Sequence, residues 1–127
     1  MSDTVLDASA LLALLNSEQG ADLVQDLLPQ AVISAVNLAE VVTRLSAIGM
    51  PENKIREALT LLGMETLSFD EEQAYGAGLL YASTQPYGLS LGDRSCLALA
   101  KMSGATAVTA DRAWEDLNVG VVIRLIR

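Results

Sequence analysis

The sequence predicts an α/β protein in which a parallel sheet is covered by helices on both faces. Short apolar runs alternate with longer segments whose apolar residues recur at helical spacing. The runs are apolar throughout, which is typical of strands that are buried on both faces. The chain has 127 residues, the size of one ordinary domain. In such sheets, ligands bind beyond the carboxyl ends of the strands.

In the first half of the chain, two predicted strands are each followed by helices. The strands are TVLD at 4–7 and AVIS at 31–34. Ser34 is expected to cap a long helix, because a serine hydroxyl accepts a hydrogen bond from a free amide in the first turn. Gly49 is expected to end that helix. The helices expected here are 8–16, 17–28, 34–48 and 52–62.

The second half continues the alternation. Ser68 and Glu71 have the spacing of a capping box, which predicts a helix from there to about Thr84. Ser90 begins a later helix that ends near Gly104. The remaining expected elements are strands at 64–68, 106–110 and 121–126, a loop at 85–89 and a short helix at 112–117.

Composition excludes several classes of protein. The chain has no histidine, which excludes Ser-His-Asp and Cys-His triads and zinc sites with histidine ligands. The single cysteine, Cys96, can form no intrachain disulfide, as is typical of a reducing compartment. No apolar run reaches the roughly 18 residues of a membrane span, and no basic region precedes an apolar one at the N-terminus. We therefore expect a cytoplasmic protein that is not associated with a membrane.

Charge and hydropathy limit the possible partners. The net charge of −8 opposes non-specific binding to nucleic acid, which relies on Lys and Arg at phosphates. A nucleic-acid function would therefore need bound metal or local basic groups. Hydrophobic residues make up 51% of the chain and the mean hydropathy is +0.35. This apolar surplus predicts that a second subunit or a partner chain covers some of the surface.

Four acidic residues lie beside apolar segments, where carboxylates left alone would lose hydration and repel one another. Asp7 ends the first strand and Asp111 ends the fourth. Glu40 and Asp93 lie in the first two turns of helices that can reach the same edge of the sheet. Hard cations such as Mg²⁺ and Mn²⁺ take oxygen ligands. A bound cation would offset both the lost hydration and the repulsion between the carboxylates. The pattern predicts metal-assisted chemistry on phosphates.

Each of these acids also has a purely structural interpretation. Asp7 and Asp111 can be N-caps, and Asp93 has the spacing of a capping-box acid. Glu40 can pair with Arg44 one helical turn later. These roles do not explain why all four acids should share one edge. Asp70 belongs to a dense acidic run at a helix start, where the helix dipole favours it, and we interpret it as structural.

Other polar residues near the four acids are expected to support the site. They supply an amide on the helix face of Glu40 and hydroxyls two residues from the acids at the strand ends: Asn37, Ser9 and Thr109. Three of the eight basic residues lie near the acids: Arg44, Arg94 and Arg112. Arg94 and Arg112 directly follow proposed ligands and are the candidate substrate contacts, with ion pairing to the acids as the alternative. Arg127 is expected to be remote.

The segments that contain the four acids resemble the acidic motifs of PIN-domain ribonucleases, in particular the VapC toxins of bacterial toxin–antitoxin modules. Any one motif is weak evidence, but the four together are specific. The resemblance covers nearly the whole chain, with the motifs in the expected order. The segments are VLDASALLALL, SAVNLAEVV, GLSLGDRSCLALA and AVTADRAW.

This resemblance implies a single PIN-like nuclease domain over residues 1–127. The implied fold is a three-layer sandwich whose parallel five-stranded sheet has the order 3-2-1-4-5. The implied function is that of a metal-dependent endoribonuclease, the toxin of a pair, which forms a homodimer and binds a cognate antitoxin. Many relatives cut structured RNA such as tRNA. The implied ligands of Mg²⁺ or Mn²⁺ are Asp7, Glu40, Asp93 and Asp111, and the supporting positions are Ser9, Asn37 and Thr109.

Two alternatives remain open. Another Mg²⁺-dependent phosphoryl-transfer domain, such as a response-regulator receiver, also uses an aspartate at a strand end. A receiver needs a second acid near the N-terminus and a lysine after a late strand, but Asp3 is a poor second acid and no lysine follows Asp111. The other alternative is a non-catalytic binding module that keeps the PIN fold. Only the presence of all four acids argues against it.

Overall fold

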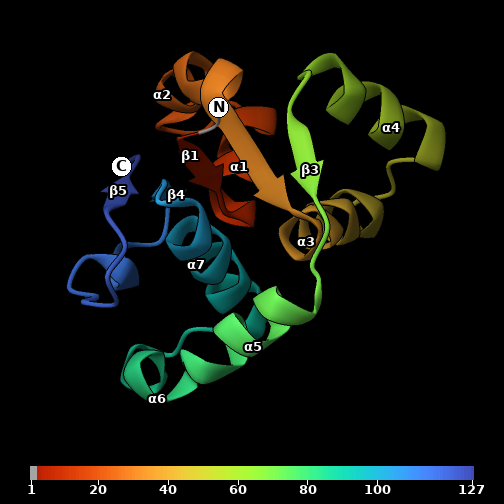
Figure 1. Cartoon of the computed structure of the whole chain (residues 1–127). Helices are drawn as coiled ribbons and strands as arrows, with labels where there is room; N and C mark the ends of the chain where they lie inside the picture. Colours follow the sequence, from red (N-terminus) through yellow and green to blue (C-terminus); the bar gives the residue numbers. More distant parts are fainter. Residues whose placement is uncertain (1–2) are drawn as a thin grey trace.

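Five parallel strands form a single sheet in the computed structural model, which describes residues 3–127 (Figure 1). The strand order is β3-β2-β1-β4-β5, so the predicted fold class and order are confirmed. This order differs from the 2-1-3-4-5 order of receiver domains, which excludes a receiver. The strands are β1 (Thr4–Leu6), β2 (Ala31–Ser34), β3 (Glu65–Leu67), β4 (Thr106–Thr109) and β5 (Ile123–Leu125).

Helices cover both faces of the sheet (Figure 1). One layer consists of α1 (Ala8–Leu15), α2 (Ala21–Leu27), α3 (Ala35–Ala47) and α4 (Glu52–Leu61). The other consists of α5 (Glu71–Leu79), α6 (Tyr81–Thr84) and α7 (Leu91–Ser103). Short 3-10 turns lie at η1 (Leu28–Gln30), η2 (Gln85–Tyr87) and η3 (Arg112–Trp114). Within residues 3–127, no helix is both long and apolar enough to cross a membrane.

The core has two halves, one on each face of the sheet. Successive residues of a strand point to opposite faces, so Val5 packs with α7 while Leu6 packs with α1 and α3. The same alternation places Val32 and Ile33 in different halves. All these side chains are buried. The continuous apolar runs of the central strands follow from this burial on both faces.

Strand register brings the ends of three strands together. Leu6 is opposite Ile33 on one side and Val108 on the other. The residues that follow them therefore emerge at the same carboxyl edge of the sheet. One of these is Asp7, whose backbone N–H donates to the Val108 carbonyl at 3.0 Å.

The predicted capping box of Ser68 and Glu71 is wrong. The chain stays extended through Asp70, which is the N-cap of α5 and accepts a hydrogen bond from the Gln73 amide at 2.9 Å. Aspartate is as good an N-cap as serine, so the helix begins two residues later than expected. Gln73 instead donates from its side chain to the Ser68 carbonyl at 2.9 Å.

The helix expected up to Thr84 is interrupted. α5 ends at Leu79 and the short α6 follows. The break comes directly after Gly76 and Gly78, and glycine in a helix costs about 1 kcal/mol relative to alanine. The expected loop at 85–89 begins with the turn η2, and β5 is shorter than the predicted 121–126.

Candidate active site

Asp7 occupies the centre of the carboxyl edge and is 3% exposed. Its Oδ1 accepts hydrogen bonds from the Ser9 hydroxyl at 2.7 Å and from the Ala10 amide at 2.8 Å. Its Oδ2 accepts one from the Thr109 hydroxyl. The Ala10 bond makes Asp7 the N-cap of α1 as well. Three donors therefore fix this carboxylate in one orientation.

Burial raises the pKa of the Asp7 carboxyl from 3.8 to about 6. The hydrogen bonds from Thr109, Ala10 and Ser9 lower this pKa, and the nearby charge of Asp93 raises it. Loss of hydration outweighs the three donors. A cation beside the carboxylate would favour its ionised form, which is the form that binds metal.

Ser9 and Thr109 connect the ends of β1 and β4. Their hydroxyl oxygens lie 3.2 Å apart. The Ser9 oxygen also accepts from the Ala110 amide at 2.9 Å, and the Thr109 oxygen accepts from the Asp111 amide at 3.0 Å. The two hydroxyls therefore hold the backbone before Asp111 in place while they donate to Asp7.

Asn37 connects α3 to the start of α7. Its fully buried side-chain amide donates to Glu40 Oε2 at 3.0 Å and to the Gly92 carbonyl at 2.9 Å. A Cβ atom at Gly92 would lie 1.8 Å from Glu40 Oε1, so any larger residue would displace this carboxylate from its place. Glu40 is thereby held against the first turn of α7. Glu40 and Arg44, both of which are described, form no ion pair, so the structural alternative for Glu40 is not seen.

Asp93 and Asp111 combine a capping role with a place at this edge. Asp93 Oδ2 accepts from the Ser90 amide at 2.9 Å, and the Asp93 amide donates to the Ser90 hydroxyl at 3.2 Å. Asp111 Oδ1 accepts from the Ala113 amide at 2.9 Å and caps η3. Each cap uses one carboxylate oxygen and leaves the other free of protein donors in the part of the chain that is described.

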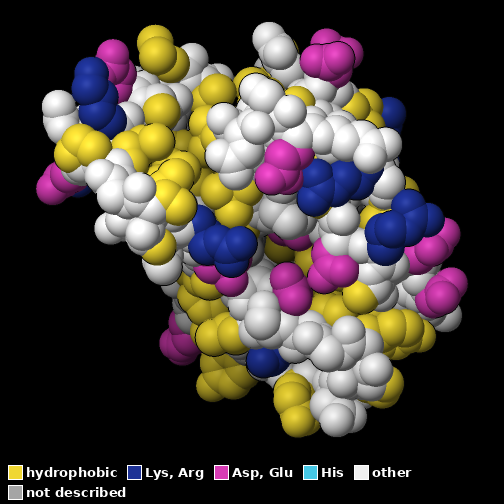
Figure 2. Space-filling view, turned by 180° about the vertical axis from the view of Figure 1, so that it is seen from behind, with side chains coloured by type: hydrophobic (Ala, Val, Ile, Leu, Met, Phe, Trp, Pro, Cys, Tyr) yellow, Lys and Arg dark blue, Asp and Glu magenta, His cyan; other side chains and the backbone are white. Residues whose placement is uncertain are grey.

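The four acids line one groove of about 670 Å³, here called the acidic groove. Figure 2 shows Asp and Glu side chains around a hollow on one face of the molecule, with Lys and Arg side chains at its border. Three of these acids also act on the same buried thiol. Burial raises the pKa of the Cys96 thiol, and the charges of Asp7, Asp93 and Glu40 raise it further. Other residues that line the groove are Ser9, Leu12, Arg44, Ile48 and Arg127.

The acidic groove suits a hard divalent cation. Its candidate ligands are all carboxylate oxygens, those of Asp7, Glu40, Asp93 and Asp111. Among the described residues, no group of three or more His, Cys, Asp or Glu side chains lies close enough together to hold a metal ion between them. Mg²⁺ keeps several of its waters and needs few direct carboxylate contacts, so an open groove with spaced carboxylates fits it.

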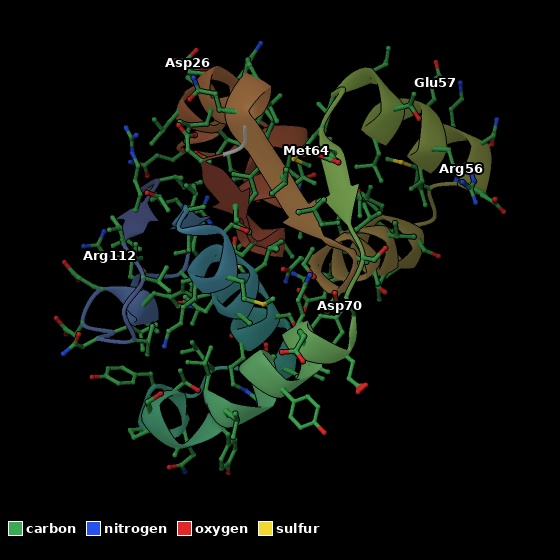
Figure 3. The ribbon with its side chains drawn as sticks, viewed as in Figure 1. Asp26, Arg56, Glu57, Met64, Asp70 and Arg112 are labelled. Atoms are coloured by element: carbon green, nitrogen blue, oxygen red, sulfur yellow. The ribbon has the colours of Figure 1, made fainter. Side chains whose placement is uncertain are left out.

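Arg94 and Arg112, the two arginines proposed to contact substrate, do not line the groove. Arg94 donates to the Ala77 carbonyl of α5 at 3.0 Å and lies over the Tyr81 ring, 5.5 Å from its centre. Arg112 donates to the Arg127 carbonyl at 3.0 Å and lies outside the sheet near β5 (Figure 3). The alternative that these arginines pair with the four acids is not seen either.

Arg127 was expected to be remote, but it lines the acidic groove. Its guanidinium donates to Glu18 Oε1 at 3.0 Å and to the Gln19 carbonyl at 3.4 Å. The signal for this position was the strand order. β5 lies beside β4, so the residues after β5 reach the same edge as Asp111.

The fold and the acidic edge define an α/β domain with a carboxylate site where the strand order reverses. The chain belongs to the PIN-domain family, since the family's sequence profile matches residues 4–119. No curated protein matches the sequence significantly.

Similar solved structures include chains of two VapBC assemblies and a VapC toxin. DNA-bound VapBC from Salmonella typhimurium contains a chain with a TM-score of 0.78 and 20% identity, and the match covers 100% of both chains. A chain of VapBC2 from Rickettsia felis has a TM-score of 0.75 and 18% identity, and the match covers 95% of this chain and 96% of the other. VapC20 from Mycobacterium tuberculosis, a toxin that cleaves the sarcin–ricin loop, has a TM-score of 0.69 and 16% identity. This match covers 94% of this chain and 98% of VapC20. At these identities the likeness establishes the fold.

Proposed function

We propose that this protein is a metal-dependent endoribonuclease that hydrolyses RNA phosphodiester bonds and is the toxin of a toxin–antitoxin pair. The observation that carries the proposal is the convergence of Asp7, Glu40, Asp93 and Asp111 on one groove of a PIN domain. The likeness to VapBC chains, and to a toxin that cleaves RNA, supports it.

In this proposal the four acids hold Mg²⁺ or Mn²⁺. The cation, when bound, stabilises charge on the phosphate and makes a bound water more acidic. The protein's own part is to hold the oxygens in place. Ser9 and Thr109 fix Asp7, and Asn37 fixes Glu40 against α7. The Ser90 capping box fixes Asp93. These bonds reduce the reorganisation needed when the cation and the phosphate bind.

The whole of residues 1–127 is proposed to be one nuclease domain that acts in the cytoplasm as a homodimer and binds a cognate antitoxin. Exposed apolar side chains support the assembly. Leu61 is 80% exposed, Leu79 79% and Val122 70%. A monomer leaves such side chains in water, whereas subunit and antitoxin contacts would cover them.

The test is RNA cleavage by the purified protein with Mg²⁺ or Mn²⁺ and with a chelator. We expect internal cuts in a structured RNA such as tRNA with either metal, and none with the chelator. Restoring the metal should restore cleavage. Persistent cleavage in chelator would contradict metal dependence. RNA binding with no cleavage under any metal would favour the non-catalytic module.

A further inference from the structure

We propose that Arg44 binds a backbone phosphate of the RNA next to the phosphate that is cleaved, and that the RNA strand runs along α3. This inference rests on the proposed nuclease function and adds a substrate contact to it. Neither Arg94 nor Arg112 fills this role, because neither lines the groove and each donates its guanidinium to a backbone carbonyl, that of Ala77 or that of Arg127.

The spacing on α3 places three different kinds of side chain in a row. Glu40, Arg44 and Ile48 follow one another at four-residue intervals, and all three line the acidic groove. Residues four apart lie on the same helix face, about 6 Å apart along its axis, and Ile48 continues the row as the C-cap of α3. An acid, a cation and an apolar side chain therefore succeed one another along one wall. Neighbouring phosphates of a nucleic-acid strand have a comparable separation.

Arg44 is the cation that is free to bind an anion in this groove. Its side chain is exposed, and it forms no ion pair within residues 3–127. Arg127 is the other basic residue of the lining, but its guanidinium is held by Glu18. Other basic side chains are paired elsewhere: Lys54 with Glu57, Arg56 with Glu52 and Arg112 with Glu115.

The charge of the protein makes such a contact necessary. A domain with a net charge of −8 repels RNA at long range, and the groove carries the four proposed ligand acids together with Glu18, which pairs with Arg127. A guanidinium binds phosphate through two parallel hydrogen bonds, which suits it better than lysine to hold a phosphate in a fixed position. Beyond Arg44, Ile48 is 73% exposed and can contact a sugar or a base.

The test compares Arg44→Ala with Arg56→Ala. Arg56 lies on the outer face of α4 (Figure 3) and pairs with Glu52 in solvent. Both substitutions change the net charge equally, so long-range repulsion is matched. Binding of a fluorescent single-stranded RNA is measured in Mg²⁺ over a range of salt, in an Asp93→Asn background. Cleavage kinetics are measured in the otherwise unaltered protein.

For Arg44→Ala we expect about tenfold weaker RNA binding. The loss of hydrogen bonds between a charged side chain and a phosphate typically weakens affinity by about this factor. The log–log salt slope should fall by roughly 0.7, as expected for one lost phosphate contact on a single strand. KM should rise more than kcat falls, and Arg44→Lys should restore part of the affinity. Arg56→Ala should match the unsubstituted protein, and the Tm should be unchanged in both.

Equal RNA affinity and equal salt slopes for Arg44→Ala and Arg56→Ala would overturn the Arg44 proposal while the nuclease function still stands. An unsubstituted protein that binds RNA through Arg44 but never cleaves it would refute the nuclease function and retain the contact. An unsubstituted protein that neither binds nor cleaves RNA would refute both.

Discussion

Asp7 shows how a structural role and a functional role coincide in one residue. Its carboxylate caps α1, accepts two hydroxyl hydrogen bonds and still lies at the edge where the other acids meet. From the sequence, capping and metal binding were competing interpretations. In the structure, capping bonds fix the carboxylates in the orientation that brings them to one groove. The capping bonds of Asp7, Asp93 and Asp111 are therefore compatible with a metal site formed by the same residues.

The raised pKa of Asp7 predicts a pH-dependent stability in the absence of metal. The folded state holds this proton more tightly than the unfolded chain, so the stabilisation is complete below pH 3.8 and is lost as pH rises through about 6. The difference corresponds to roughly 3 kcal/mol. Urea unfolding in chelator should show Asp7→Asn as about equal to the unsubstituted protein at pH 4 and more stable at pH 7. Parallel pH profiles for the two proteins would contradict this assignment.

Thr109→Val removes one hydroxyl and keeps the shape of the side chain. Asp7 Oδ2 then loses its donor in a buried site, which should cost about 1–3 kcal/mol of unfolding free energy at neutral pH. Cleavage should fall as well, because Asp7 is no longer fixed. Thr60→Val, on the exposed side of α4, is the control and should change stability by less than about 0.5 kcal/mol. Denaturant titration of both variants checks this, and equal losses would show that the hydroxyl of Thr109 has no special role.

At the scale of elements, the start of α3 and the start of α7 meet through Glu40, Asn37 and Gly92. Gly92→Ala should abolish most cleavage because the added methyl occupies the place of the Glu40 carboxylate. Stability should change little, since alanine favours the helix by about 1 kcal/mol and offsets part of the clash. Gly78→Ala in α5 is the matched control, because a Cβ there meets nothing within 4 Å.

Gly78→Ala should keep full cleavage and should be slightly more stable than the unsubstituted protein. Cleavage assays and thermal unfolding of the two variants together separate displacement of Glu40 from a general effect on helices. Full activity in Gly92→Ala would mean that Glu40 is not needed where the structure places it.

The common edge of the four acids could be predicted because it depends on local rules. Asp7 and Asp111 directly follow apolar strands, and parallel strands end at a common edge. The directions of Arg94 and Arg112 could not be predicted, since they depend on carbonyl groups that only the packed structure brings near. For Arg94 that group is the Ala77 carbonyl of α5. The place of Arg127 was predictable in principle, once the strand order was applied to the residues after β5.

The start of α5 could not be assigned from the sequence because two good caps compete there. Ser68 and Asp70 are both strong N-cap residues, and both are followed three positions later by a side chain that can complete a local bond. The choice falls to Asp70 because β3 continues to Leu67 and the chain then needs extended residues to reach α5. The position of this N-cap depends on the distance that the chain must span between β3 and α5 rather than on the N-cap preferences of the two residues.

At the scale of the whole molecule, the exposed apolar side chains predict a dimer. Sedimentation at micromolar concentration should give twice the mass of the 13.4 kDa chain. Leu79 is a suitable position to probe, because it is 79% exposed and contributes little to the core. Leu79→Glu should leave the fold intact and weaken the dimer if α5 belongs to the interface. A monomer at every concentration would show that the exposed apolar residues serve another partner.

The comparison of Asp93→Asn with Asp70→Asn in an RNA cleavage assay with Mg²⁺ tests the proposed metal centre most directly. Asp70 is the N-cap of α5, where asparagine is equally good, and Asp93 is the third residue of the Ser90 capping box, where asparagine keeps an acceptor oxygen, so both variants should fold. Asp93 lines the acidic groove and Asp70 does not. We expect Asp93→Asn to lose cleavage and Asp70→Asn to keep it. Equal loss in both variants, or full cleavage by Asp93→Asn, would contradict a metal centre at the acidic groove.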